Sequence, residues 1–211
     1  TIGFCVCLLT GDIVFAGQYK NSTLKNEVSF GISRTQIYLG KLIAQTLLSI
    51  VYLVIMMGFF IGLCAIVLPH GADTVLTIRD VVFPAELTGD AGALTIVGYF
   101  LAVGLPLWIG AQAAVCMCQF LVAGEMAGSF LYVGIVFVLE TIVELTGLLA
   151  GGGVGKLLLT IHPYFPRTML DGAKAVVGDP VYLGQAWIVG AFWMVVCTAI
   201  GLYGFHRKEI K

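Results

Sequence analysis

Two glutamates lie four residues apart in a long apolar stretch of the chain. Glu140 and Glu144 are the only charged residues between positions 126 and 150. That spacing places both side chains on one face of a helix, where they could bind a cation or a polar substrate, or exchange a proton. An ionisable group costs at least about 2.5 kcal/mol when it meets lipid at the bilayer centre. The sequence therefore favours a simpler alternative, in which both glutamates lie near the outer end of the helix and face solvent.

A second polar pattern recurs at helical spacing within residues 91–122. Gln112, Cys116 and Gln119 form one seam on the predicted helix. Hydrogen bonding to a neighbouring helix is the favoured interpretation of such a seam, and lining a substrate path is the alternative. The candidate substrate-path residues are therefore Gln112, Gln119, Glu140 and Glu144.

Two smaller features also suggest contacts between helices. Asp12 could pair with Lys20 or with a partner chain, and solvation at the membrane interface explains it equally well. The small residues of Gly58-x-x-x-Gly62 and Gly124-x-x-x-Gly128 predict close helix packing.

No pattern in the sequence supports catalysis. The run Gly151-Gly-Gly-Val-Gly-Lys156 departs from a nucleotide-binding P-loop, which needs glycine where Ala150 stands and Ser or Thr where Leu157 stands. His162 belongs to no set with zinc-ligand spacing, and no nucleophile elbow is present. We therefore predict that this chain is not an enzyme, has no catalytic or metal-binding residue and binds no cofactor itself.

The composition indicates that lipid, rather than water, surrounds most of the protein. Of 211 residues, 59% are hydrophobic and 11% are charged, and the mean hydropathy is +1.01. A soluble domain carries about 25% charged residues, so this chain cannot cover a water-facing surface. No basic stripe suggests nucleic acid. A backbone in lipid must satisfy its own hydrogen bonds, which predicts an all-α, polytopic membrane helix bundle.

Five stretches approach the roughly 20 apolar residues that a spanning helix needs. They cover residues 1–16, 42–68, 91–122, 126–150 and 186–205. No repeat or linker divides the chain, so residues 1–211 are expected to form one membrane domain.

Basic residues predict the orientation of these spans. If the segment 20–41 and the tail lie on one side, that side carries seven of the 11 Lys and Arg residues. The positive-inside rule then places both, including the C-terminus, in the cytoplasm. Segments 69–90 and 151–185 lie outside. A chain that begins outside without a leader predicts a sixth helix upstream.

The segment 20–41 carries the strongest local signals. Any of residues 21–23 can cap a helix start, and the short stretch that follows ends at Gly31, which suits a left-handed helix stop. Ser33 and Gln36 match a capping box directly before an apolar run. We expect a short surface helix, a glycine turn and a capped helix that enters the membrane. An interfacial connector bound to lipid headgroups and a docking element for a cytoplasmic partner explain this pattern equally well.

Three short motifs in this segment resemble a known family. Thr23-Leu-Lys-Asn26, Gly31-Ile-Ser-Arg34 and Lys41-Leu-Ile43 are similar to the first cytoplasmic loop of ABC-transporter permeases of the type-2 exporter class. In particular, the segment resembles bacterial permeases that handle lantibiotics, other antimicrobial peptides or drugs. The resemblance extends to the order of spans over nearly the whole chain, although the family has six spans and this chain five.

The resemblance implies a division of labour between subunits. A separate P-loop ATPase dimer would bind ATP and Mg²⁺ and push on the short cytoplasmic coupling helix. A second copy, or a homologous permease, would complete the path by which a peptide, drug or lipid-like substrate leaves a bacterial cell through the plasma membrane. The expected ATPase-coupling residues are Thr23, Leu24, Lys25, Asn26, Glu27, Val28, Gly31, Ile32, Ser33 and Arg34.

Two other functions remain open on the sequence. An ion-coupled secondary transporter would use Glu140 and Glu144. An intramembrane enzyme using His162 and a glutamate is weaker, since no motif links those residues.

Overall fold

The computed structural model describes residues 2–15, 23–67, 93–122, 125–150, 152–173 and 176–207, and every regular element within these ranges is helical. The predicted outer segment 69–90 lies outside these ranges. The described elements are α1 (Ile2–Phe15), α2 (Thr23–Ser29), α3 (Arg34–Val67), α6 (Ala93–Leu121), α7 (Glu125–Val133), the π-helical turn η1 (Gly134–Val138), α8 (Leu139–Leu149), α9 (Gly152–Ile161), the 3-10 turn η2 (His162–Tyr164), α10 (Pro166–Gly172) and α11 (Pro180–Arg207).

Four of the described helical segments are long and apolar enough to cross a membrane. They are Arg34–Phe59, Gly98–Leu121, Met126–Leu149 and Pro180–Arg207. The predicted all-α, polytopic membrane bundle is therefore confirmed. Within the expected span 1–16, the described helix α1 has 14 residues and measures about 21 Å, compared with the roughly 30 Å hydrocarbon core.

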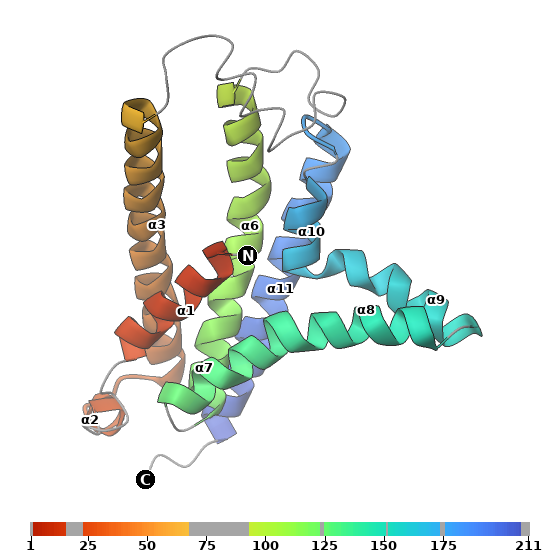
Figure 1. Ribbon diagram of the computed structural model, residues 1–211. Helices are drawn as coiled ribbons and strands as arrows, with labels where there is room; N and C mark the ends of the chain where they lie inside the picture. Colours follow the sequence, from red (N-terminus) through yellow and green to blue (C-terminus); the bar gives the residue numbers. More distant parts are fainter. Residues whose placement is uncertain are drawn as a thin grey trace.

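Three long helices run side by side, and a fourth crosses them. Figure 1 shows α3, α6 and α11 upright, with α7 and α8 running across their length and α9 returning beside α8. In the most apolar stretch of α6, 61% of the residues are buried, compared with 11% in that of α3. Helix α6 is therefore the centre of the bundle, and α3 is its outermost long helix.

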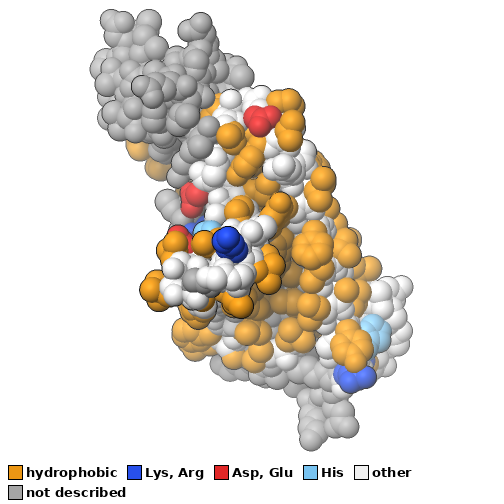
Figure 2. All heavy atoms as spheres, turned by 90° about the vertical axis from the view of Figure 1, so that its right-hand side faces the viewer, with side chains coloured by type: hydrophobic (Ala, Val, Ile, Leu, Met, Phe, Trp, Pro, Cys, Tyr) orange, Lys and Arg blue, Asp and Glu red, His pale blue; other side chains and the backbone are white. Residues whose placement is uncertain are grey.

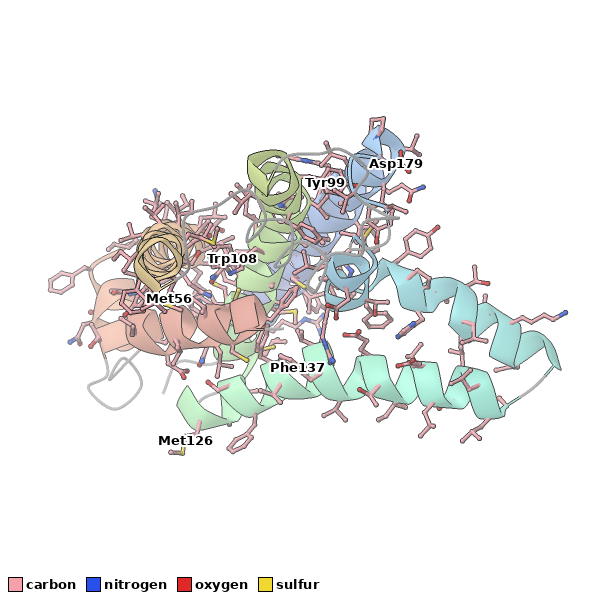
Figure 3. All side chains as sticks on the ribbon, turned by 45° about the horizontal axis from the view of Figure 1, so that its top comes forward. Met56, Tyr99, Trp108, Met126, Phe137 and Asp179 are labelled. Carbon is pink, nitrogen blue, oxygen red and sulfur yellow. The ribbon has the colours of Figure 1, made fainter. Side chains whose placement is uncertain are left out.

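The principal contact is between α6 and α11, and glycines bring the two helices together. A Cβ atom added at Gly190 would lie 2.5 Å from the carbonyl carbon and oxygen of Pro106, and one at Gly110 would lie 3.1 Å from the carbonyl oxygen of Gly190. Because glycine has no side chain, the backbones of α6 and α11 can touch at these positions. At the other end of the pair, the Tyr99 hydroxyl donates to the Asp179 carbonyl over 3.2 Å (Figure 3).

Two helices begin earlier than the hydropathy predicted. Helix α3 starts at Arg34, at the capping box that the sequence indicated, so a polar first turn precedes the apolar run that begins near residue 42. Helix α11 starts at Pro180 rather than near 186. Proline suits the first helical position, and the Asp179 carboxylate accepts the Val181 backbone N–H over 2.9 Å.

The outer surface is largely apolar. Figure 2 shows hydrophobic side chains over most of the described part of one face, with few charged groups among them. Leu148, Ile188 and Phe192 are each more than 60% exposed. An exposed apolar surface of this extent suits contact with lipid or with another protein.

Candidate functional site

The short helix α2 ends at the glycine that the sequence indicated. The Phe30 backbone N–H donates to the Asn26 carbonyl over 3.0 Å, and the Gly31 N–H donates to the Val28 carbonyl over 3.1 Å. Gly31 has a φ of 83°, in the left-handed region where glycine meets no steric penalty. The predicted glycine stop is confirmed.

Helix α3 starts with the predicted capping box. The Ser33 backbone N–H donates to Gln36 Oε1 over 3.2 Å, and the Gln36 N–H donates to Ser33 Oγ over 3.2 Å. These reciprocal bonds satisfy two amides that a helix start leaves exposed. Residues 31–33 therefore form a short, defined elbow between α2 and α3.

An ion pair fixes α2 against α3 beyond the elbow. Lys41 Nζ lies 3.1 Å from Glu27 Oε1, and the two side chains are 18% and 27% exposed. Because both side chains are largely buried, water screens this pair less than an ordinary surface pair. Val28, on the same helix, packs beside the buried cluster that includes Phe15 and Tyr38.

Arg34 joins the start of α3 to the end of α11. Its Nη1 donates to the carbonyl oxygens of Phe205 and His206, each over 2.8 Å. Its guanidinium also lies 5.7 Å from the centre of the Phe205 ring. The last carbonyls of a helix lack internal partners and carry the negative end of its dipole, so a cation suits this position. The sequence indicated Arg34 but not this partner.

The remaining coupling candidates lie at the surface or outside the description. Thr23, Asn26 and Ile32 are exposed. The side chains of Leu24 and Lys25 are outside what the structure describes, although both residues lie on α2. Phe30, which was not among the candidates, is 84% exposed. An exposed aromatic ring at the elbow is a contact that a docking partner could cover.

The predicted seam on α6 is buried between helices. Gln112 is 1% exposed, exchanges a hydrogen bond with Thr10 over 3.2 Å and accepts one from Gln45 over 2.5 Å. Gln119 is fully buried and donates to the Asp12 carboxylate over 3.2 Å. The favoured interpretation, hydrogen bonding between helices, is confirmed for both glutamines.

Asp12 also has a partner that the sequence did not suggest. Its carboxylate accepts hydrogen bonds from Gln119 and from Ser129, whose hydroxyl lies 2.5 Å away. Lys20, the expected partner, lies outside the described residues. The carboxylate therefore joins α1 to α6 and α7.

Replacing Gln112 with leucine should loosen the contact among α1, α3 and α6. The change leaves the Gln45 amide without its partner side chain and removes the hydrogen bond to Thr10. Hydrogen bonds between membrane helices contribute about 0.6 kcal/mol each and up to about 1.7. We expect a loss of about 1–2 kcal/mol, measured by thermal unfolding in detergent. Gln185→Leu on the exposed side of α11 is the control, and an equal loss in both variants would contradict the prediction.

The two glutamates of the fourth apolar stretch lie in different environments. Glu144 has a side chain 54% exposed, and its Oε2 lies 3.7 Å from His162 Nε2. Glu140 is 7% exposed and accepts a hydrogen bond from the Thr168 hydroxyl over 2.5 Å. The expectation that both face solvent is therefore wrong for Glu140, because η2 and α10 fold back over α8.

The surroundings of these two glutamates include an arginine but, among the described residues, no set of metal ligands. Arg167 lies over the Phe137 ring at 5.4 Å, and Figure 3 shows Phe137 where α7 meets α8. Among the described residues, no group of three His, Cys, Asp or Glu side chains is arranged to hold a metal ion.

Comparison with known proteins adds no assignment. No protein-family model, no curated protein and no solved structure matches the chain. What is established is the class: a membrane protein built from apolar helices.

Proposed function

We propose that this chain is the membrane-spanning subunit of an ATP-driven exporter, with α2 as the helix on which a separate ATPase subunit acts. The observation that carries the proposal is that α2 and its elbow are fixed to two long helices. Glu27 and Lys41 join α2 to α3, and Arg34 joins the start of α3 to the end of α11.

These contacts define how movement passes into the membrane. A push on α2 reaches α3 through the Glu27–Lys41 ion pair and the capped elbow, and it reaches α11 through Arg34. Helix α11 packs along α6, so displacement at α2 is transmitted to the centre of the bundle. Small shifts at a docking site become rigid-body helix movements in this way, because packed helices have few alternative arrangements.

The proposal includes partners that supply what the chain lacks. A P-loop ATPase dimer binds ATP and Mg²⁺, and a second copy or a homologous permease completes the path. The substrate class is a peptide, a drug or a lipid-like molecule exported across a bacterial plasma membrane. A groove of about 450 Å³ between η2 and α11, lined by apolar side chains that include Tyr164, Phe192 and Trp193, supports a substrate with an apolar part.

The second candidate function is an ion-coupled secondary transporter. The burial of Glu140 favours it, because a buried carboxyl group within an apolar helix is a common feature of proton and cation pathways. Transport that persists without the ATPase but stops when the ion gradient is dissipated would select this function.

Crosslinking at α2 tests the proposal directly. A photo-crosslinking amino acid at Asn26, which is exposed, should capture a P-loop ATPase in membranes of the native organism. The same amino acid at Thr160, exposed on α9, should not. Membrane vesicles containing both subunits should export substrate with ATP and without an ion gradient. Capture at Thr160 alone, or export that ignores ATP, would overturn the proposal.

A further inference from the structure

Glu140 has one oxygen bonded and one oxygen unsatisfied. The Thr168 hydroxyl donates to Oε1, whereas Oε2 is fully buried and has no hydrogen-bond partner. The residue as a whole is 7% exposed. A buried carboxylate normally satisfies both oxygens, and Oε2 of Glu140 departs from that rule.

Among the described residues, no Lys, Arg or His side chain forms an ion pair with Glu140. Lys41 pairs with Glu27, and His162 lies beside Glu144. Arg167, next in sequence to Thr168, lies over Phe137 instead, and its buried Nε has no hydrogen-bond partner. Burying an unpaired ionised carboxylate costs several kcal/mol. A proton on Glu140 removes that cost without moving any neighbour.

A continuous row of polar groups leads from the surface to Glu140. Glu144, half exposed, lies 3.7 Å from His162 Nε2. The same nitrogen lies 3.4 Å from the Thr168 hydroxyl oxygen, which in turn donates to Glu140. The row passes from α8 through η2 and α10 and back to α8.

We propose that Glu140 is a proton-binding site, filled from the surface at Glu144 through His162 and Thr168. Protonated His162 gives its Nε2 proton to the Thr168 oxygen, while the hydroxyl proton of Thr168 passes to Glu140 Oε1. His162 is then neutral and takes a new proton from the Glu144 carboxyl group or from water. One proton enters at the surface and one reaches Glu140, so charge and atoms balance.

The bound proton decides which group Arg167 contacts. With Glu140 neutral, the guanidinium stays on the Phe137 ring. Glu140 lies about one helical turn after Phe137. If Glu140 were ionised, it would attract the Arg167 guanidinium and pull α10 towards α8. The other charged residues on the packed elements are Lys156 on α9 and Asp171 on α10. The π-helical turn η1 ends two residues before Glu140, and such turns are frequent at functional sites.

Infrared spectroscopy of the full chain in lipid vesicles tests the site. The wild type should show the C=O band of a protonated carboxyl group, and Glu140→Gln should lack it. Asp171 is exposed on α10, so Asp171→Asn should keep the band. A wild type without the band, or a Glu140→Gln protein that retains it, would overturn the proposal.

Exchange kinetics test the route and do not require a change at Glu140. After transfer to D₂O, the band of Thr168→Val should shift at least about tenfold more slowly than that of the wild type, because the relaying hydroxyl is gone. Thr168→Ser should restore the rate, and His162→Gln should slow it. Equal rates in Thr168→Val and the wild type would exclude this route. The test does not depend on an ATPase, so its failure leaves the proposed function untouched.

Discussion

Replacing Arg34 with alanine should separate ATP hydrolysis from export. The change removes both hydrogen bonds to the last carbonyls of α11 but leaves the capping box of α3 in place. The protein should therefore still insert and bind the ATPase. Coupling between two sites is commonly worth 1–3 kcal/mol, or about 5- to 150-fold. We expect substrate exported per ATP hydrolysed to fall by about tenfold, measured in vesicles containing both subunits.

Arg207 provides a matched control on the same helix end. Its guanidinium lies 4.5 Å from the Tyr203 ring, and the residue is exposed, so Arg207→Ala removes an arginine without releasing α3 from α11. Export per ATP should stay at the wild-type value. Arg34→Lys should recover part of the coupling, since an ammonium group can still approach the carbonyls. Unchanged coupling in Arg34→Ala would show that the elbow does not transmit movement.

The elbow could be predicted from the sequence because its signals are local. Gly31, Ser33 and Gln36 act on backbone groups within a few residues, and their types alone determine which bonds can form. The partner of Arg34 could not be predicted in this way, since its two carbonyls lie more than 170 residues along the chain. Only the packing of α3 beside α11 brings them together.

Glu140 shows the same limit at the other candidate site. From its position in an apolar helix, the Glu140 side chain could face either solvent or the protein interior, and the sequence favoured solvent. The outcome depends on η2 and α10, which fold back and place Thr168 on the carboxyl group. The π-helical turn before it also has no sequence signature, because residues 134–138 read as an ordinary apolar helix.

Small residues were an uneven guide to helix packing. The Gly58-x-x-x-Gly62 pattern predicted a close contact, but a Cβ atom at either glycine would meet nothing within 4 Å among the described residues. Gly128 of the second pattern does make one, since a Cβ atom there would lie 3.0 Å from Gln119 Cα. The close approach of the α6 and α11 backbones lies at Gly110 and Gly190, which belong to no such pattern. Spacing shows that a close approach is possible, whereas the partner surface decides where it occurs.

Replacing Gly190 with alanine should destabilise the whole bundle. The added Cβ would lie 2.5 Å from the Pro106 carbonyl carbon and oxygen, and backbone atoms cannot move aside as a side-chain end can. Overpacking of a core costs about 1–3 kcal/mol, and occasionally more. Because the collision separates α6 from α11, the principal helix pair, we expect a loss at or above about 3 kcal/mol, seen as a lower Tm in detergent and a lower yield of folded protein.

Gly184→Ala, on the same helix, isolates this collision from the general effect of removing a glycine. A Cβ atom at Gly184 meets nothing within 4 Å, and alanine is favoured over glycine in a helix by about 1 kcal/mol. Its Tm should therefore equal or exceed that of the wild type. Within α6, Gly98→Ala should behave in the same way, since its added Cβ also meets nothing. If Gly190→Ala unfolded at the temperature of these two variants, α6 and α11 would not be in backbone contact at Pro106, and transmission from α11 to the bundle centre would need another route.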